Sequence, residues 1–487
     1  MKTIFFFTFG LFISVTSIQS QWTQVGSDIG GEAFGDESGW SVSLNSDGSV
    51  VAIGALYNDE NGTSSGQVRI YKNVSGTWTQ VGSDIDGEVF GDESGWSVSL
   101  SSDGSIVAIG EPFNDENSIS SGRVRIYKNV SGTWTQIGEN IVGETHGDLA
   151  GYSVSLNSDG SIVAIGARDN DENGSNSGQV RIYKNVSGTW TQVGQNINGE
   201  AAGDKFGASV SLSSDGSIVA VGAYDNDGNG SNSGHVRVYK NVSGTWTQVG
   251  QDINGEAAGN KFGTSVSLSS DGSIVAIGTP YIDSMRGQVR IYKNVSGTWT
   301  QVGQDINGEE TGDWSGWSIS LSSDGSIIAI GAPFNSGSDS YSGQVRVYKN
   351  VSGTWTQVEQ DIDGKEAGDR NGISVSLSSN GSIIAIGAPY LEGNNSNPGH
   401  VRVYKNGALN ISDIKEAGIS IYPNPSTGIF NIKNAKGYNI TITDIVGKII
   451  YHNTATVNEQ VHLQQNGIYI INFKSQTNNF SSKIIVN

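Results

Sequence analysis

A period of 56 residues runs through most of the chain and constrains its fold more than any other feature. Two markers follow it: the tryptophan of Trp-Thr-Gln and the tyrosine of Val-Arg-(Ile/Val)-Tyr-Lys, each present seven times. In both series one spacing is 53 residues and the other five are 56. The tryptophans are Trp22, Trp78, Trp134, Trp190, Trp246, Trp299 and Trp355. A repeat of about 50 residues suits a four-stranded propeller blade better than a helical or leucine-rich unit.

Each copy of the repeat contains four segments with strand patterns. In the second copy they are 96–100, 106–110, 123–128 and 134–138. The first alternates apolar and small residues, whereas the second is continuously apolar, as in a strand buried on both faces. The repeat region begins with a fourth strand, 22–26, and ends with a third strand, 401–405. We therefore predict an all-β fold: a seven-bladed β-propeller whose N-terminal strand completes the last blade and closes the ring.

Composition excludes several classes of protein. The 48 acidic residues outnumber the 28 Lys and Arg, and the net charge of −20 argues against nucleic acid as a partner. The absence of cysteine excludes disulfides and thiolate metal sites. The 68 glycines among 487 residues indicate many turns, and 35% hydrophobic residues suffice for a large core.

The first 20 residues have the pattern of a secretory signal. Lys2 precedes an apolar stretch, 4–15, and the small residue Ser20 offers a cleavage site. This stretch is too short for a comfortable membrane span, and no later stretch is long enough. We expect 1–20 to be a signal peptide and the mature chain to have no transmembrane segment and to be a monomer.

Residues 21–405 form the predicted propeller, and the motifs around its strands resemble a known family. Phe206-Gly207 and Phe262-Gly263 precede the first strand, and Gly331-Ala332-Pro333 follows the second. These motifs resemble the FG-GAP repeat of seven-bladed propellers like those of integrin α-subunits. Other copies keep them only in part, with Ser38 or Asn371 in place of the phenylalanine. The resemblance implies an extracellular ligand-binding or adhesion module.

After residue 405 the period stops and tryptophan disappears. Residues 406–417 are expected to be a linker, and 418–487 carry short β patterns that predict a small β-sandwich. The segment contains, in order, Tyr422, Pro423, Asn424, Pro425, Gly428, Asp444, Gly447, Lys448, Gly467, Tyr469 and Lys483. These residues resemble motifs of the C-terminal sorting domain of the bacterial type IX secretion system, in which they would form the sorting signal. The resemblance implies passage through the periplasm, the type IX machinery as a partner, and a secreted or outer-surface location.

Catalytic residues are not evident. None of the five histidines has a partner at metal-ligand spacing, and none belongs to a recognisable triad. His235 and His400, at the start of the third strand, are expected on the strand surface. We predict that the repeated tryptophans of the fourth strand pack between blades rather than bind sugar.

Calcium is the one cofactor that the sequence suggests. Two loops after the second strand place oxygen-bearing side chains at alternating positions before a glycine, as a calcium loop does. The candidate ligands are Asp169, Asp171, Asn173, Asp225, Asp227 and Asn229. Neither loop has a glutamate at the twelfth position, and related loops begin with Tyr57 or Phe113, which favours a solvated turn.

Loop charge leads to the functional hypothesis. The loops after the second strand and the crossovers between copies share one face, and most of the acidic residues lie there. Loops on a rigid scaffold are the usual seat of recognition. We predict a non-catalytic propeller that binds an extracellular protein or glycan through this acidic face, in adhesion, matrix binding or glycan recognition. The alternatives are a secreted polysaccharide hydrolase or lyase with acids at the channel mouth, and a structural surface-layer component.

Overall fold

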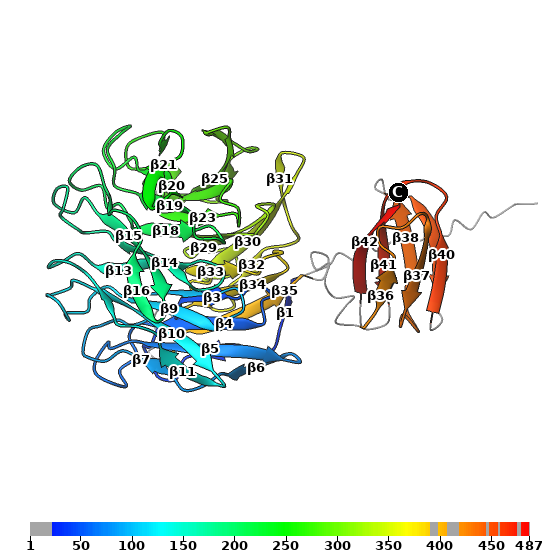
Figure 1. Cartoon of the computed structure of the whole chain (residues 1–487), viewed down its shortest axis with the longest axis horizontal. Coiled ribbons are helices and arrows are strands. Elements are labelled where there is room, and N and C mark those ends of the chain that lie inside the picture. The colour runs from blue at the N-terminus through cyan, green and yellow to red at the C-terminus, as the bar shows by residue number, and fades with distance from the viewer. Residues whose placement is uncertain are drawn as a thin grey trace, which may run out of the picture.

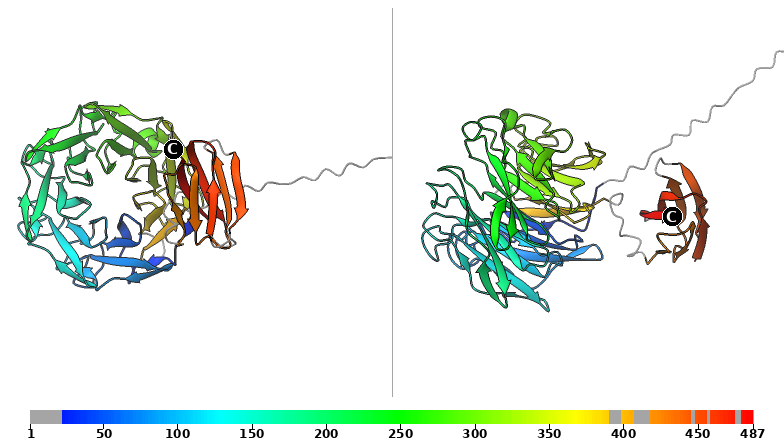
Figure 2. Two further views of the ribbon diagram at one scale, coloured as in Figure 1. Left: turned by 45° about the vertical axis from the view of Figure 1, so that its right-hand side comes forward. Right: turned by 45° about the horizontal axis from the view of Figure 1, so that its top comes forward.

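The computed structural model describes residues 22–389, 398–406, 418–444, 448–455, 458–474 and 479–486. The predicted signal peptide with Ser20 lies outside the described residues, as do 407–417 of the expected linker. Seven antiparallel sheets from the repeat region are arranged in a ring (Figures 1 and 2). Repeated four-stranded antiparallel sheets of this kind are consistent with a β-propeller.

Each sheet has four main strands, which follow one another outward from the centre of the ring. The first strands are β3 (Ser38–Leu44), β8 (Ser97–Leu100), β13 (Ala150–Leu156), β18 (Ser209–Leu212), β23 (Ser265–Leu268), β28 (Ser318–Leu321) and β33 (Ser374–Leu377). The second strands are β4 (Val50–Ala55), β9 (Ile106–Glu111), β14 (Ile162–Ala167), β19 (Ile218–Ala223), β24 (Ile274–Thr279), β29 (Ile327–Ala332) and β34 (Ile383–Ala388). The third strands are β5 (Gln67–Val74), β10 (Arg123–Val130), β15 (Gln179–Val186), β20 (His235–Val242), β25 (Gln288–Val295), β30 (Gln344–Val351) and β35 (His400–Lys405).

The outer edge of each sheet is formed by two short strands. The fourth strands are β1 (Thr23–Gln24), β6 (Thr77–Gln80), β11 (Thr133–Gln136), β16 (Thr189–Gln192), β21 (Thr245–Gln248), β26 (Thr298–Gln301) and β31 (Thr354–Gln357). Each is followed by a two-residue strand that pairs with the same third strand: β2 (Ile29–Gly30), β7 (Ile85–Asp86), β12 (Ile141–Val142), β17 (Ile197–Asn198), β22 (Ile253–Asn254), β27 (Ile306–Asn307) and β32 (Ile362–Asp363). The outer edge is therefore interrupted, a detail that the repeat pattern did not predict. Between β24 and β25 lies the four-residue α1 (Ile282–Met285).

Burial of the strands matches their composition. Every residue of β4 is buried, as expected for a continuously apolar strand between neighbouring sheets. The third strands are buried in their first half and alternate between half-buried and exposed in their second half. The apolar core forms separate clusters in which side chains of one sheet pack against the next, as in the cluster of Val68, Ile70, Val107 and Ile109.

The two ends of the repeat region belong to one sheet. Strands β1 and β2 pair with β35, with Thr23 opposite Lys405 and Ile29 opposite Val401. A chain of backbone hydrogen bonds also connects the turns between first and second strands. Each donor N–H is followed by its acceptor in the series Ser46, Ser102, Ser158, Ser214, Ser270, Ser323, Ser379 and again Ser46, with N···O distances of 2.8–3.0 Å.

Close approach between sheets explains the glycine at the end of the second strand. A Cβ atom on Gly110 would lie 2.0 Å from the carbonyl oxygen of Gly151 in the next copy. Only glycine fits there, and the hydroxyl of Ser97 donates to the same Gly151 oxygen at 2.8 Å. The glycines of the two sequence motifs therefore meet across the boundary between copies.

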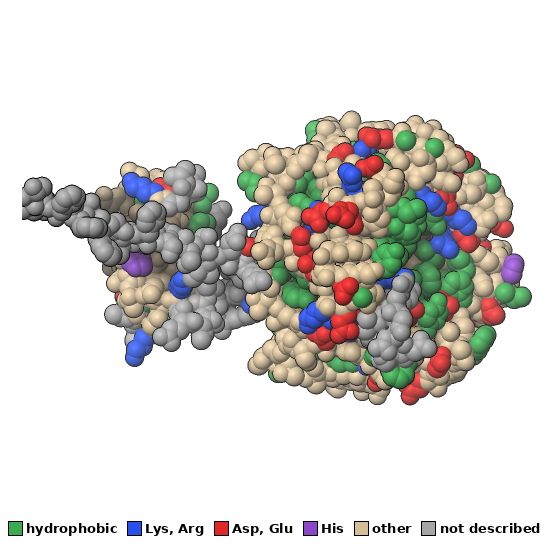
Figure 3. Space-filling view, turned by 180° about the vertical axis from the view of Figure 1, so that it is seen from behind, with side chains coloured by type: hydrophobic (Ala, Val, Ile, Leu, Met, Phe, Trp, Pro, Cys, Tyr) green, Lys and Arg blue, Asp and Glu red, His purple; other side chains and the backbone are tan. Residues whose placement is uncertain are grey.

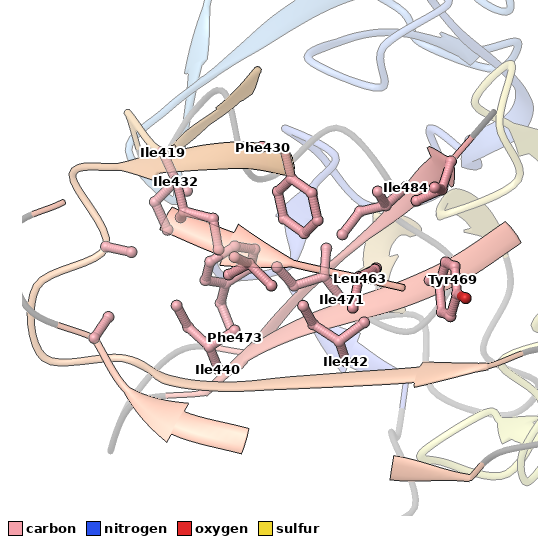
Figure 4. Packing of buried hydrophobic residues seen from close by; sticks show 14 residues of the cluster. Ile419, Phe430, Ile432, Ile440, Ile442, Leu463, Tyr469, Ile471, Phe473 and Ile484 are labelled. Atoms are coloured by element: carbon pink, nitrogen blue, oxygen red, sulfur yellow. The ribbon is translucent and has the colours of Figure 1, made fainter. Parts of the chain in front are cut away.

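The C-terminal segment forms two antiparallel sheets. One contains β36 (Ser420–Tyr422), β37 (Ile429–Lys433) and β40 (Asn458–His462), and the other contains β39 (Ile449–Thr454), β38 (Asn439–Asp444), β41 (Gly467–Lys474) and β42 (Asn479–Val486). The sequence patterns predict strands at 419–422, 428–432, 438–443, 448–452, 467–473 and 483–486, but not β40. Both sheets contribute to one core around Phe430, Ile432, Ile442, Ile471 and Phe473 (Figure 4).

Candidate functional site

One position in every copy has a backbone conformation that its side chain does not favour. The residue before the Phe-Gly or equivalent pair has a φ between 50° and 58° in all seven copies. These residues are Glu37, Glu93, Leu149, Lys205, Lys261, Trp314 and Arg370. The left-handed region costs most residues about 1 kcal/mol or more, and Gly or Asn would relieve this cost. None of the seven is Gly or Asn, so fold stability alone does not explain them.

The residue after each of these pairs lies at the start of the first strand, nearest the centre of the ring. From copy 1 to copy 7 these residues are Trp40, Trp96, Tyr152, Ala208, Thr264, Trp317 and Ile373. All seven line one cavity of about 330 Å³, together with Arg168, Tyr224, Lys261 and Tyr281. We call this cavity the central cup. Its volume lies at the lower end of the range for small-molecule sites.

Aromatic rings form much of the wall of the central cup. The ring of Trp96 lies between those of Trp40 and Tyr152, with both centroid distances at 5.2 Å. In copy 6, Trp314 packs 5.4 Å from Trp317 and 4.9 Å from Tyr281. The small residues of copies 4 and 5 leave space that bulky side chains fill in the other copies. Apolar side chains indeed gather over the middle of the ring, with basic side chains beside them (Figure 3).

Basic side chains of copies 3 and 5 form a second part of the wall. The Lys261 ammonium lies 5.0 Å from the ring of Tyr224 and 5.3 Å from that of Tyr281. The Arg168 guanidinium lies 3.8 Å from the centre of the Tyr152 ring, and its Nη1 donates to the Tyr224 hydroxyl at 3.3 Å. Such cation–π contacts hold the positive charges in fixed places.

In copies 1 and 2 the acidic residues Glu37 and Glu93 stand at the repeat position that Lys261 of the cup wall occupies in copy 5. Burial raises the pKa of the Glu93 carboxyl to about 7. Burial also raises the pKa of Tyr57, and the charges of Glu93 and Glu37 raise it further. This repeat position therefore holds acids in copies 1 and 2 and lysines in copies 4 and 5, and Glu93 can exchange a proton near neutral pH.

The predicted calcium ligands lie in the loops that follow the second strands of copies 3 and 4. In each loop the first candidate pairs with a lysine, whereas the other two form hydrogen bonds with the backbone. Asp169 Oδ1 is 2.7 Å from Lys205 Nζ, and Asp225 Oδ1 is 2.9 Å from Lys261 Nζ. Two lysines that the sequence analysis did not single out therefore accompany the first candidate ligand of each loop. The remaining candidates serve the loops themselves. Asp171 and Asp227 each accept a hydrogen bond from a backbone N–H five residues later, and Asn173 and Asn229 donate to the carbonyls of Gly199 and Gly255.

Crossover acids outside the central cup are largely paired with arginine. The third-strand Arg69, for example, is buried and lies 3.5 Å from Glu32. Comparable pairs recur at Arg125–Glu88, Arg181–Glu144, Arg237–Glu200, Arg290–Glu256 and Arg346–Glu309. In copy 7, Lys365 replaces the glutamate and Arg402 pairs with Asp28 instead, at 2.9 Å. Part of the acidity of the loop face is thus neutralised by arginines of the third strands.

Two groups of side chains in the described residues could bring three metal-binding atoms together, Glu200–His235–Asp252 and Glu32–Glu60–Asp84. In the first, the Arg237 guanidinium binds both carboxylates, with two contacts of 2.9 Å to Asp252. An arginine already neutralises these acids, which favours an ion-pair network over a metal centre.

The predictions for the fourth-strand tryptophans and for the third-strand histidines have different outcomes. The packing role of the fourth-strand tryptophans is confirmed: the indole of Trp78, for example, donates to the Val25 carbonyl of the preceding copy at 2.8 Å. The expectation that His235 and His400 lie on the strand surface is wrong, since they are 1% and 8% exposed. The third strand begins between two neighbouring sheets, which is why this position is buried.

Other grooves in the described part follow the repeat. One of about 740 Å³ lies beside Trp190 and Val142, and another of about 450 Å³ lies beside the equivalent Trp78. Because both surround equivalent tryptophans, they reflect how neighbouring copies pack. The central cup is instead formed by all seven copies at once, with a different residue from most of them.

The predicted sorting residues shape turns and core of the C-terminal segment. Tyr422 ends β36, and Pro423, Asn424 and Pro425 follow it, with the Asn424 side chain accepting from the Ile485 N–H at 2.9 Å. Gly428 has a φ of 94° just before β37.

The remaining sorting residues are spread over the second sheet. Asp444 accepts from the Lys448 N–H at 2.9 Å. Gly467 begins β41, and the buried Tyr469 donates to the Gln465 carbonyl at 2.7 Å. Gly447 lies outside the described residues, and Lys483 is placed only by its backbone, in β42.

Fold and site together define a class: an all-β repeat protein with an aromatic, charged cup at the centre of its loop face and a separate C-terminal β module. Family models narrow this class. Residues 30–71 and 198–239 match the FG-GAP repeat, and 420–487 match the secretion system C-terminal sorting domain. The sorting domain indicates export by type IX secretion to the cell surface or the extracellular space. In the part of the chain that the structure describes, no helix has the length and apolar character to cross a bilayer.

Comparison with curated proteins gives no match. Among solved structures, the chain is similar to a candidate 6-phosphogluconolactonase from Bacteroides uniformis, with 13% sequence identity and a TM-score of 0.49. That match covers 85% of this chain and all of the other. A similarity of this degree says nothing about the activity of the chain.

Proposed function

We propose that the protein is a secreted or cell-surface, non-catalytic ligand-binding protein that recognises an extracellular ligand in the central cup. The observation that carries this proposal is the set of seven left-handed positions, each three residues before a residue that lines the cup. Each holds a residue costlier than glycine, and six of them, all except the buried Leu149, carry acidic, basic or aromatic side chains. Side-chain chemistry at the mouth, rather than loop stability, accounts for this choice of residues.

The proposal includes a seven-bladed, ring-closed propeller in residues 21–405 and a sorting domain in 418–487. Pairing of β1 and β2 with β35 supports closure, as does the chain of seven hydrogen bonds that returns to Ser46. Closure matters for function because it fixes the positions of groups from all seven copies relative to one another. A preorganised site loses less entropy when it binds a ligand.

Recognition would take place at the cup rather than across the whole acidic face. Arginines neutralise much of the outer acidity, whereas the cup keeps exposed rings and charged groups. Clustered aromatic rings with a few fixed polar groups are the usual composition of a small-molecule or glycan site.

One observation favours a second function, a polysaccharide hydrolase or lyase. Glu93 has a pKa near 7, which suits a general acid, and Glu37 is the equivalent residue of the neighbouring copy. Under this alternative, Glu93→Gln would abolish turnover of a bound polysaccharide while leaving its binding intact.

Binding of the mature chain to arrays of extracellular glycans and matrix proteins tests the proposed function. Trp40→Ala and Trp96→Ala should weaken binding about tenfold or more, because they remove stacking surface from the cup. Phe34→Ala is the matched control, since this aromatic residue is 68% exposed on a crossover outside the cup. Equal loss of binding in the control, or no loss in the cup variants, would refute the cup as the site.

A further inference from the structure

The charges around the central cup are unevenly distributed among the copies. Copies 3, 4 and 5 contribute Arg168, Lys205 and Lys261, whereas the acids paired with them are Asp169 and Asp225. Asp169 alone serves both Arg168 and Lys205. This side of the mouth therefore has more cationic than anionic groups, although the chain as a whole carries −20.

Two of these cations are held in place before any ligand arrives. Lys261 is fixed by two tyrosine rings and by Asp225, and Arg168 by the face of Tyr152 and the hydroxyl of Tyr224. Both side chains are partly exposed, at 28% for Lys261 and 22% for Arg168. Fixed, accessible cations can donate to an anionic group with little loss of side-chain entropy.

Indole rings line the same cavity. Trp40, Trp96 and Trp317 are half-buried, so part of each ring system faces the cup. Flat apolar surface beside fixed cations suits a ligand with a weakly polar ring face and a negatively charged substituent. A pyranose that carries a carboxylate or a sulfate has this combination, because the axial C–H groups of the ring stack on indole.

We propose that the ligand of the central cup is an anionic saccharide, whose ring stacks on the indole wall and whose carboxylate or sulfate accepts hydrogen bonds from Lys261 and Arg168. This inference rests on the proposed function and names the class of ligand for the same site.

The negative net charge of the protein distinguishes specific from non-specific binding of an anionic saccharide. A chain of −20 repels polyanions at long range, so non-specific electrostatic binding of an acidic polysaccharide is disfavoured. Added salt should screen this repulsion and increase the association rate, whereas binding to a generally basic surface becomes weaker as salt is added.

Titration calorimetry of the mature chain with three oligosaccharides of equal length tests the inference: an oligogalacturonate, a sulfated galacto-oligosaccharide and an uncharged galacto-oligosaccharide. We expect one or both anionic ligands to bind at least tenfold more tightly than the uncharged one, and the difference between them identifies the preferred group. Lys261→Gln should remove this preference, and Lys261→Arg should retain most of it.

Controls separate charge recognition from folding. Lys72→Gln removes an exposed lysine from a third strand, at its end away from the cup, and should change nothing. Asp225→Asn combined with Lys261→Gln avoids an unpaired carboxylate and should also lose the preference. Thermal melting confirms that each variant is folded.

The possible outcomes distinguish the two proposals. Equal affinity for charged and uncharged ligands, with sensitivity to Trp40→Ala, overturns the anionic ligand and retains the cup as a binding site. A charge preference that persists in both Lys261→Gln variants also overturns the inference. Absence of binding to all three oligosaccharides overturns the inference, and the proposed function then depends on the array with its cup variants.

Discussion

A buried ion pair that occurs in only one copy allows a sharp test of the structure. In copy 2, Glu111 ends the second strand and Arg123 begins the third, and the two are paired directly opposite each other. Their side chains are 0% and 3% exposed. Copy 1 has Ala55 and Gln67 at the same places, and copies 3 and 6 have the same Ala and Gln pair.

Replacing Glu111 with alanine should destabilise the repeat domain by about 3 kcal/mol. Loss of one partner from a buried pair typically costs 3–5 kcal/mol, because the remaining charge is desolvated without compensation. Burial alone would lower the pKa of Arg123, but Glu111 and nearby acids hold it above its usual value. The lower end of the range applies because Glu88 and Asp92 still lie 2.7 and 3.2 Å from Arg123.

The double variant Glu111→Ala/Arg123→Gln should recover most of this loss, to within about 1 kcal/mol of the wild type. It recreates the Ala and Gln pair of copy 1, where the Gln67 amide donates to Glu32 and Glu60, each at 3.4 Å. Copy 2 has Glu88 and Glu116 at the equivalent positions. Arg125 keeps its bonds to the Asp86 carbonyl and the Tyr127 hydroxyl and has Glu88 3.7 Å away. Asp92 keeps the hydrogen bond from the Asn114 amide at 2.8 Å.

Urea denaturation followed by tryptophan fluorescence measures these differences. All 11 tryptophans lie between residues 22 and 355, so the signal reports on the repeat domain and not on the C-terminal module. A Glu111→Ala variant within 1 kcal/mol of the wild type would refute the assigned pairing. A double variant as unstable as the single one would show that copy 2 does not accept the side chains of copy 1.

Three further predictions concern pH, calcium and export. Burial lowers the pKa of His400 to about 4, so its folded pKa lies below that of the unfolded chain, and the repeat domain should lose about 2 kcal/mol of stability from this residue between pH 7 and pH 5. His400→Gln should remove this loss in urea titrations at the two pH values, and an unchanged pH dependence would contradict it. Because Lys205 and Lys261 accompany Asp169 and Asp225, millimolar Ca²⁺ should raise the melting temperature by less than about 2 °C relative to EDTA. A larger rise that Asp171→Ala abolishes would instead establish a calcium site. Deletion of 418–487 should retain the protein in the periplasm, as cell fractionation would detect, and undisturbed surface delivery would contradict the sorting assignment.

The repeat itself predicts most of the strands. Strand β9, for example, spans Ile106–Glu111 where the pattern predicted 106–110, because a continuous apolar run has few alternatives in an all-β chain. The two-residue strands such as β12 (Ile141–Val142) escaped prediction because they are too short to show an alternating pattern. They exist because the third strand is longer than the fourth and its free half needs a partner.

The central cup escaped prediction for a different reason. Its lining comes from one or two residues in each copy, and these become neighbours only when the sheets form a ring. A signal was nevertheless present in the sequence. The position that holds Trp40 in copy 1 holds Tyr152, Ala208 and Ile373 in other copies, although the strand that follows changes little. Variation at one register position of an otherwise uniform repeat marks the residues that face the axis.

Charged groups were also harder to place than apolar ones. The sequence analysis assigned most acidic residues to the loops of one face. The pairing of Glu32 with the buried Arg69, however, depends on how neighbouring sheets approach each other. A sequence gives the sign of each charge and not its partner. Local charge balance around the cup therefore differs from the balance of the whole chain.

The seven left-handed positions have a consequence for how such a protein can change over time. Each position belongs to the same loop in its own copy, and the loop conformation tolerates residues as unlike as Glu93, Leu149 and Trp314. A single codon change at one of these positions can therefore alter the chemistry of one copy and its immediate neighbour while the strands of the scaffold keep their sequence. Ligand preference can therefore change by single substitutions at these loop positions, one step at a time, while the scaffold is retained.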